Sequence, residues 1–395
     1  MSQLFSIEDL TRKDVHSTPK FALFELGFRP FFLLGGVFAL LAVIPWVLAL
    51  HGIVLGQTAS IWWHAHEMIF GFALAIIYGF LLTAGQNWTG VASPRGLPLL
   101  ILVLLWLLPR LGLAFLPQVP LLIWAMCDVL ANLAVMAVMA RMVFKAKQWR
   151  NAPFVLILAG FAMLNGFSYF TYITGHLDIA TRIHDASLWV IAVVINLMGG
   201  RVIPAFTQGA TQFKRTPEPT WLVRASTTGL LLVALVWLID TPVFLRMMSA
   251  ITAGLLFYRW NMWGWTFSLK NPLLWSLHLS FVCLPIACGL IALGYPRSGA
   301  LHVLTIGAVT GLIVSMMSRV SLGHTGRMLK APRLMPWAFG LIACAALLRA
   351  VAAVWDSAYL YLIDGALLLW VLAFACFVWH YALILLHSRL DGKRG

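Results

Sequence analysis

Long uninterrupted runs of apolar residues restrict what this chain can fold into. They recur from residue 28 to residue 387, and many are close to 20 residues long, the length that an α-helix needs to cross a bilayer. Hydrophobic residues make up 62% of the chain and charged residues only 10%, whereas a soluble domain carries about 25% charged residues. Too little polar surface is left to cover a water-facing globule. The sequence therefore predicts an all-α, polytopic membrane helix bundle.

Prolines, glycines and clusters of charge divide the apolar runs into twelve predicted spans. The seventh and eighth are the least clearly separated, because only Asp240, Thr241 and Pro242 lie between them. We expect one transmembrane domain over residues 28–387, with a cytoplasmic segment over 1–27 and a cytoplasmic tail over 388–395. The predicted spans are 28–50, 62–86, 97–116, 119–143, 153–175, 183–205, 221–240, 242–258, 272–294, 298–321, 334–355 and 358–387.

The positive charges orient the predicted spans. With twelve spans both termini lie on one side of the membrane, and most lysines and arginines fall on that side. Loops rich in Lys and Arg are usually cytoplasmic, so both termini are predicted to be cytoplasmic. Topology and attraction to anionic membrane lipids account for the net charge of +14 without a nucleic-acid partner. The arginines on or near the other side are Arg110, Arg182, Arg246, Arg297 and Arg349.

A weak internal periodicity divides the twelve spans into three sets of four. His66, His184 and His302 are 118 residues apart, and each lies near the start of an even-numbered span. The rest of the alignment at this offset is poor. Two interpretations stay open, namely a three-fold repeat with pseudo-threefold symmetry and a coincidence of histidines.

Histidines gather at two predicted depths in the membrane. Ionisable residues within a span usually face the protein interior or a water-filled cavity, because contact with lipid is costly for them. The directions of the spans place one group near the outer face and another near the cytoplasmic face. The outer group is His64, His66, His184 and His302, with Glu67 and Asp185 adjacent. The inner group is His278 and His324, with Arg201, Arg319 and Arg327 nearby.

The phrase WWHAHEM, residues 62–68, holds two of the outer histidines. His64 and His66 diverge by about 200° around a regular helix, so we expect them to serve two sites, or one to be a ligand and the other its partner. His64 and Glu67, at i and i+3, share a helix face, which allows a hydrogen-bonded pair. Neutral imidazole is the commonest protein ligand of copper and haem iron. The alternative for any single histidine is a solvated interfacial side chain.

Two arginines lie where even-numbered spans meet the predicted cytoplasmic face. Arg201 stands in GGRVIPAFTQG and Arg319 in SRVSLGHTGR. A guanidinium group pairs well with carboxylates, and haem propionates are carboxylates. Anchoring of the helix ends by positive charge explains both arginines equally well, so both interpretations stay open.

Several phrases together resemble the NnrS family, and they occur in order over essentially the whole chain. The resemblance implies a multi-pass protein of the bacterial inner membrane that carries haem and copper and acts in the response to nitric oxide, often alongside denitrification. The histidines of the family carry over to His64, His66, His278, His302 and His324, whereas His184 belongs to no family motif. The phrases are FRPFF (28–32), WHAHEM (63–68), NWTG (87–90), GGRVIPAFT (199–207) and HTGR (324–327).

A looser likeness, in architecture alone, is to haem–copper oxidases and nitric oxide reductases. We expect a redox protein with haem b and copper, served by an unknown electron donor, in which Glu67 delivers protons for the reduction of nitric oxide to nitrous oxide. The alternatives are a protein that binds nitric oxide or metal without turnover, and a transporter of metal or haem. We expect copper on the outer histidines and haem on His278 and His324, or else one outer histidine as the axial haem ligand.

Overall fold

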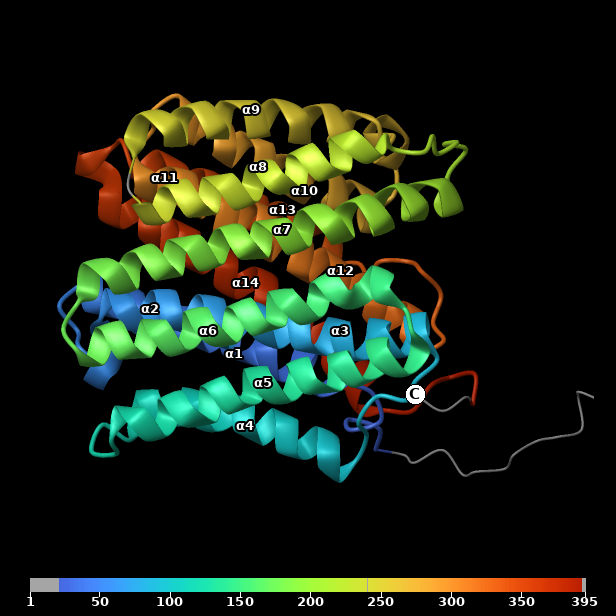
Figure 1. Ribbon diagram of the computed structural model, residues 1–395, viewed down its shortest axis with the longest axis horizontal. Helices are drawn as coiled ribbons and strands as arrows, with labels where there is room; N and C mark the ends of the chain where they lie inside the picture. The colour runs from blue at the N-terminus through green and yellow to red at the C-terminus, as the bar shows by residue number, and fades with distance from the viewer. Residues whose placement is uncertain (1–20, 240, 393–395) are drawn as a thin grey trace, which may run out of the picture.

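The computed structural model describes residues 21–239 and 241–392, and this part of the chain is built from helices that run back and forth along one axis (Figure 1). The predicted all-α bundle with twelve long helices is confirmed within these residues. The helices are α1 (Phe28–Leu50), α2–η3–α3 (Ile61–His66, Glu67–Ala73, Leu74–Thr89), α4 (Leu97–Phe115), α5 (Leu121–Ala146), α6 (Ala152–Ile173), α7 (Leu177–Ala210), α8 (Thr220–Ile239), α9 (Pro242–Asn261), α10 (Pro272–Ala292), α11–η6–α12 (Arg297–His302, Val303–Thr310, Gly311–His324), α13 (Met335–Ala352) and α14 (Tyr359–Leu386).

Eleven of these helices in the described residues are long and apolar enough to cross a membrane, and α9 is the remaining one. Polar residues within α9 lower its apolar content. Its outward side is still apolar, since several large hydrophobic side chains are exposed there: Val243, Phe244, Met247 and Ile251. The predicted break between the seventh and eighth spans is confirmed, because α8 ends at Ile239 and α9 begins at Pro242, where the fixed φ of proline suits the first helical position.

Two of the long helices contain a π-helical stretch at corresponding positions. The stretch η3 begins directly after His66, and η6 begins directly after His302. Such stretches are rare and frequently lie at functional sites. The third helix of the predicted repeat, α7 with His184, is α-helical over its whole length. The histidine alignment therefore coincides with a shared backbone feature in two of its three positions.

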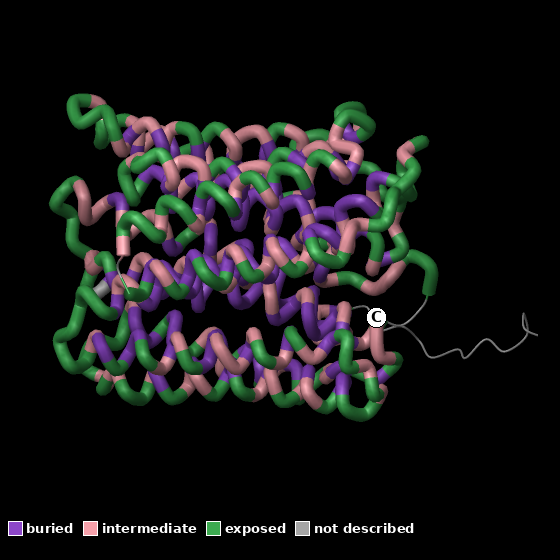
Figure 2. The backbone as a smooth tube through the Cα atoms, turned by 45° about the horizontal axis from the view of Figure 1, so that its top comes forward, coloured by how far each residue is buried: buried purple, intermediate pink, exposed green. Residues whose placement is uncertain are grey.

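The packing of the helices agrees with three sets of four. The second helix in each set is the most buried, since 78%, 67% and 78% of the apolar windows of α2–η3–α3, α7 and α11–η6–α12 lie inside the structure. Contacts of α5 with α6, of α9 with α10 and of α14 with α1 join neighbouring sets and close the ring. Figure 2 shows the buried residues gathered along the middle of the bundle.

The first and last helices are bonded to each other at one end of the bundle. The buried Arg29 donates from Nη1 to the backbone oxygens of Leu385, at 3.0 Å, and His387, at 2.7 Å. The N–H of Ala22 donates to the backbone oxygen of Leu386 at 2.7 Å. These bonds satisfy carbonyl groups that the C-terminal turn of a helix leaves without intrahelical partners.

The two ends of the bundle are named here for one residue each. The Arg201 end holds the start of α1 and the end of α14, and the C-terminal end of the chain is marked there in Figure 1. The His64 end holds the starts of α2, α7 and α11. The predicted cytoplasmic segments are described only in part, because residues 1–20 and 393–395 lie outside the described residues.

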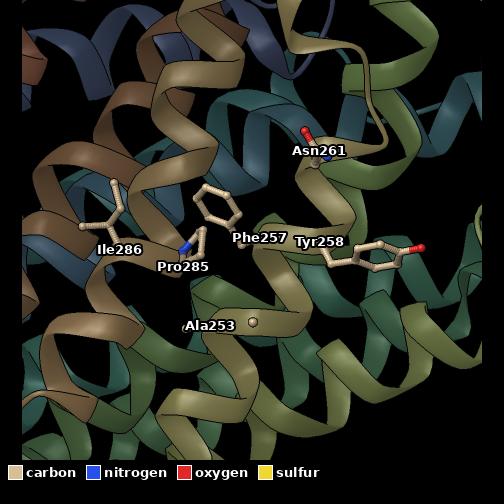
Figure 3. A pocket seen from close by; sticks show the side chains of 7 residues that line it. Ala253, Phe257, Tyr258, Asn261, Pro285 and Ile286 are labelled. Atoms are coloured by element: carbon tan, nitrogen blue, oxygen red, sulfur yellow. The ribbon is translucent and has the colours of Figure 1, made fainter.

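The outward surface of the bundle carries many large apolar side chains, as a lipid-facing surface does. A groove of about 600 Å³ lies on this surface between α9 and α10. Phe257 and Pro285 project into the groove from the two helices, while Tyr258 points away from it (Figure 3). The residues that line it are Ala253, Gly254, Phe257, Tyr258, Asn261, Pro285 and Ile286.

Candidate functional site

A network of buried ionisable side chains surrounds His66. Its Nδ1 lies 2.9 Å from Glu67 Oε1, and its Nε2 lies 2.9 Å from Asn165 Oδ1. Glu67 Oε2 forms an ion pair with Arg110 Nε at 2.7 Å, and Arg110 Nη2 donates to Asp128 Oδ2 at 2.5 Å. All five side chains are buried. Both ring nitrogens of His66 are thus already engaged, and a metal ion at His66 has to displace one of these partners.

A glycine and an aromatic ring make room for this network and orient it. A Cβ atom on Gly71 would lie 2.8 Å from Glu67 Oε2 and 3.1 Å from Arg110 Cδ, so only glycine fits there without displacing the ion pair. Tyr169 donates from its hydroxyl to Asp128 Oδ2 at 3.2 Å. Side chains from several helices therefore hold the carboxylates of Glu67 and Asp128 in place.

The predicted pair of His64 and Glu67 is wrong. Glu67 pairs with the adjacent His66 and with Arg110, and His64 faces other residues. The helix register is not the cause, because the N–H of Glu67 still bonds to the backbone oxygen of Trp63, four residues earlier. The carboxylate of Glu67 instead turns to the buried guanidinium of Arg110, with which it forms a charge-assisted contact. The predicted divergence of His64 and His66 is confirmed, because the two rings contact different neighbours.

A second set of polar side chains lies at the His64 end, on α2, α11 and α13. The ring of His64 stacks on Trp46 with centroids 5.0 Å apart, and its Nδ1 is buried without a hydrogen-bond partner. His302 donates from Nδ1 to the backbone oxygen of Ser298 at 2.7 Å, which leaves its Nε2 with a lone pair. Arg349 Nη2 lies 3.4 Å from each ring nitrogen of His302.

The remaining outer histidine, His184, lies against the His66 network. The two ring centroids are 6.1 Å apart, and Ser168 Oγ lies 2.6 Å from His184 Nε2. The adjacent Asp185 accepts a hydrogen bond from Trp237 Nε1 at 2.8 Å and pairs with Arg297. The four predicted outer histidines therefore divide between two groups, His66 with His184 and His64 with His302.

Two of the predicted inner residues contact neighbouring positions of α7 near the Arg201 end. His278 Nε2 lies 3.0 Å from Thr207 Oγ1, and its Nδ1 is buried without a hydrogen-bond partner. Thr207 donates its own proton to the Ile203 carbonyl at 2.9 Å, so its oxygen accepts from His278. The guanidinium carbon of Arg319 lies 4.0 Å from the ring centroid of Phe206.

The other three predicted inner residues lie elsewhere at the same end, and one of them, Arg327, donates from Nη1 to the Thr325 backbone oxygen at 3.4 Å. The ring of His324 lies against that of Phe28 on α1, with centroids 5.6 Å apart. The guanidinium carbon of Arg201 lies 5.9 Å from the ring of Trp88 and 5.3 Å from that of Phe154. Within the described residues no hydrogen bond, ion pair or ring contact joins His324 or Arg201 to His278.

The polar groups at both ends come from sequence motifs, and those motifs match a known family. A family model described as NnrS protein matches residues 22–389. The chain belongs to the NnrS family. Membership of this family supports a membrane protein of the nitric oxide response. No curated protein matches the chain.

In this NnrS protein, His64 and His302 are the side chains best suited to hold copper. The buried Nδ1 of His64 lacks a partner, and the bond from His302 to the Ser298 carbonyl orients its ring as such bonds orient metal ligands. Within the described residues no three His, Cys, Asp or Glu side chains form a metal-binding group. The donor set here is thus a pair of imidazoles, a ligand type that suits copper.

For haem, the search for a buried ring nitrogen without a hydrogen-bond partner favours His278 in this NnrS protein. Its buried Nδ1 has no partner, and its Nε2 is held by Thr207. A ring fixed in this way offers one nitrogen lone pair to an iron atom, as axial histidines do. The assignments of haem to His324 and of haem propionates to Arg201 and Arg319 stay predictions.

Sequence reasoning missed three charged partners, which are Arg110 for Glu67, Asp128 for His66 and Arg349 for His302. A signal was present, because an ionisable residue inside an apolar run usually faces the protein interior and has a partner. Arg110 and Asp128 both interrupt such runs. What one sequence does not provide is which helices are neighbours, and hence which charges meet.

Proposed function

We propose that this protein of the NnrS family binds copper at the His64 end and haem b at the Arg201 end, and that it acts on nitric oxide in the bacterial inner membrane. The observation that carries the proposal is the buried Nδ1 of His64, which has no hydrogen-bond partner and lies at the same end of the bundle as His302 and Arg349. A buried polar atom without a partner is costly. A bound metal ion would remove that cost.

The residues around the proposed copper site suit a reaction in which negative charge develops on a small ligand. When bound, copper and haem would supply one-electron redox chemistry and a binding position for nitric oxide. Arg349 holds a positive charge 3.4 Å from the His302 ring, and a fixed charge of this kind stabilises developing negative charge in a site of low polarity. The stacked Trp46 covers one face of His64 and limits the access of water from that side.

The second candidate function is binding of nitric oxide without turnover. The observation that favours it is the engagement of Glu67, the residue expected to deliver protons. One carboxylate oxygen of Glu67 faces His66 and the other forms an ion pair with Arg110. A carboxylate held in this way has to break a buried contact before it can pass a proton on.

Metal analysis tests where the two metals bind. In protein purified in detergent, we expect His302→Ala and His64→Ala to lower bound copper at least tenfold with haem retained, and His278→Ala to remove haem with copper retained, because each change deletes a proposed ligand. Copper is measured by plasma mass spectrometry and haem by its optical spectrum. The matched control is His51→Ala, since His51 pairs with Asp364 in an exposed position.

Two outcomes would count against this assignment. Wild-type protein without stoichiometric copper or haem contradicts the proposed function as a whole. Equal copper content in wild type, His64→Ala and His302→Ala contradicts the proposed copper ligands, but it does not contradict the proposal that the protein binds copper and haem. Anaerobic consumption of nitric oxide with a supplied electron donor, measured on the same preparations, separates turnover from binding alone.

We also propose that the Arg201 end faces the cytoplasm, with both termini there. Loops with an excess of Lys and Arg stay on the cytoplasmic side, and the Arg201 end carries Lys147, Arg150, Arg215 and Arg389 on its loops and ends. Single cysteines at Lys147 and at His51, labelled with a membrane-impermeant maleimide in intact cells, test the orientation. Labelling at position 147 but not at 51 would contradict it.

A further inference from the structure

A basic cavity opens at the Arg201 end, away from the histidine groups. Its volume is about 600 Å³, and it lies where the end of α3, the α5–α6 connection and α7 meet. Three of its lining residues are cations and none is acidic. The lining residues are Trp88, Lys147, Gln148, Trp149, Arg150, Asn151, Met198, Arg201 and Val202.

Arg201 is held in this cavity by neutral groups only. Its guanidinium lies over the rings of Trp88 and Phe154. Its Nη1 donates to Asn151 Oδ1 at 3.3 Å and its Nη2 to the backbone oxygen of Arg150 at 3.5 Å. Asn151 is itself oriented by a bond from its Nδ2 to Gln148 Oε1 at 3.2 Å. The positive charge of Arg201 is thus positioned, with no carboxylate among these contacts.

Lys147 brings a second charge to the cavity at a backbone position that favours glycine. Its φ of +53° is the only positive φ of a non-glycine residue in the described part of the chain. A side chain in this conformation costs about 1–2 kcal/mol. Helices commonly end in such a residue, which is usually glycine. A lysine at a position that favours glycine points to a use for its charge.

The start of α6 adds a further positive potential. The short 3₁₀ turn η4 (Trp149–Asn151) leads directly into the 22-residue α6, and Asn151 forms no side-chain cap for that helix. The helix dipole places partial positive charge at this end of α6, although the N–H of Ala152 is bonded to the Trp149 oxygen and Pro153 has no N–H. Three side-chain cations therefore line one cavity, and the start of α6 lies beside it.

We propose that this cavity binds the phosphate group of an anionic phospholipid. A tetrahedral phosphate has enough oxygen atoms to accept from Arg201, Lys147 and Arg150 together. A lipid fits better than free phosphate because the rim is apolar. Phe144 and Trp149 are each 59% exposed and pack edge to face, with centroids 5.4 Å apart. Tryptophan is enriched where helices meet the head groups of a bilayer.

The test measures lipid retained by the full-length protein. Wild type in nanodiscs of phosphatidylcholine with a fraction of phosphatidylglycerol is expected to retain phosphatidylglycerol through detergent extraction, as read by native mass spectrometry. Lys147→Gly and Arg201→Gln are each expected to weaken retention about tenfold, because each removes a charge-assisted hydrogen bond. Lys147→Gly also relieves the backbone strain, so its melting temperature stays at or above that of wild type.

Matched controls come from the same end of the bundle. Arg141→Ala and Lys145→Ala remove exposed cations of α5 that do not line the cavity, and we expect retention to change less than twofold. Equal losses in these controls, or equal retention of phosphatidylcholine, would overturn the proposal. A parallel arm uses radiolabelled inorganic phosphate. Phosphate binding that depends on Lys147 and Arg201, with no selective retention of phosphatidylglycerol, would overturn the lipid assignment.

Discussion

Replacing Arg110 with methionine is expected to lower the free energy of unfolding by about 3–5 kcal/mol, the usual cost of removing one partner from a buried ion pair. Arg110 lies between Glu67 and Asp128, and all three side chains are buried. Its loss leaves two carboxylates close together inside the bundle. Their mutual repulsion and their desolvation both oppose folding. Thermal unfolding in detergent, followed by tryptophan fluorescence, measures the effect.

Neutralising Glu67, Arg110 and Asp128 together tests whether unpaired buried charge causes the expected loss of stability. In the triple variant with Glu67→Gln, Arg110→Met and Asp128→Asn no buried charge lacks its partner, and we expect it to recover at least half of the lost stability. The control Arg141→Ala removes an exposed arginine and should change stability by less than about 0.5 kcal/mol. A single Arg110→Met variant as stable as that control would show that the buried network does not support the fold.

A methyl group at Gly200 is expected to cost about 3 kcal/mol or more, because it occupies the space of a buried guanidinium. A Cβ atom there would overlap Arg259 Nη2. Arg259 donates from Nη1 to the Asn196 backbone oxygen at 2.8 Å and from Nε to Glu218 Oε2 at 2.7 Å. Moving the guanidinium leaves the carboxylate of Glu218 without its partner, which is costly in a buried position.

The control for this change is Gly209→Ala on the same helix. A Cβ atom at Gly209 would meet nothing within 4 Å, and alanine favours a helix over glycine by up to about 1 kcal/mol. We therefore expect Gly209→Ala to unfold at the same temperature as wild type or slightly above it. If Gly200→Ala and Gly209→Ala had equal melting temperatures, the close approach of Arg259 to α7 would not be a constraint on folding.

The helices were predictable from sequence because a helix that contacts lipid needs an apolar run of its own, which is visible without knowledge of its neighbours. Even the weakest boundary, at Pro242, was correct. The histidines near the ends of spans were also visible as interruptions of those runs. These signals are local, and their interpretation needs only the length of a helix and the thickness and polarity of a bilayer.

The partners of those histidines were not predictable, because they depend on which helices touch. Glu67 was expected beside His64, yet its carboxylate turns to Arg110 on α4. Arg349 was counted only as a charge on the outer side, although it lies beside His302. A charge within a span indicates that it has a partner, but one sequence does not show which helix supplies that partner.

Hydrogen bonds join Ala22 to Leu386, and Arg29 to the end of α14. Because the first and last helices are adjacent, the arrangement of the helices in space does not depend on which helix comes first in the chain. Each set of four helices touches both other sets, so the bundle is cyclic although the polypeptide is linear. Chains whose ends are adjacent tolerate circular permutation. A permuted chain that starts at α10, with residues 22 and 386 bridged by a short linker, should therefore assemble the same three sets.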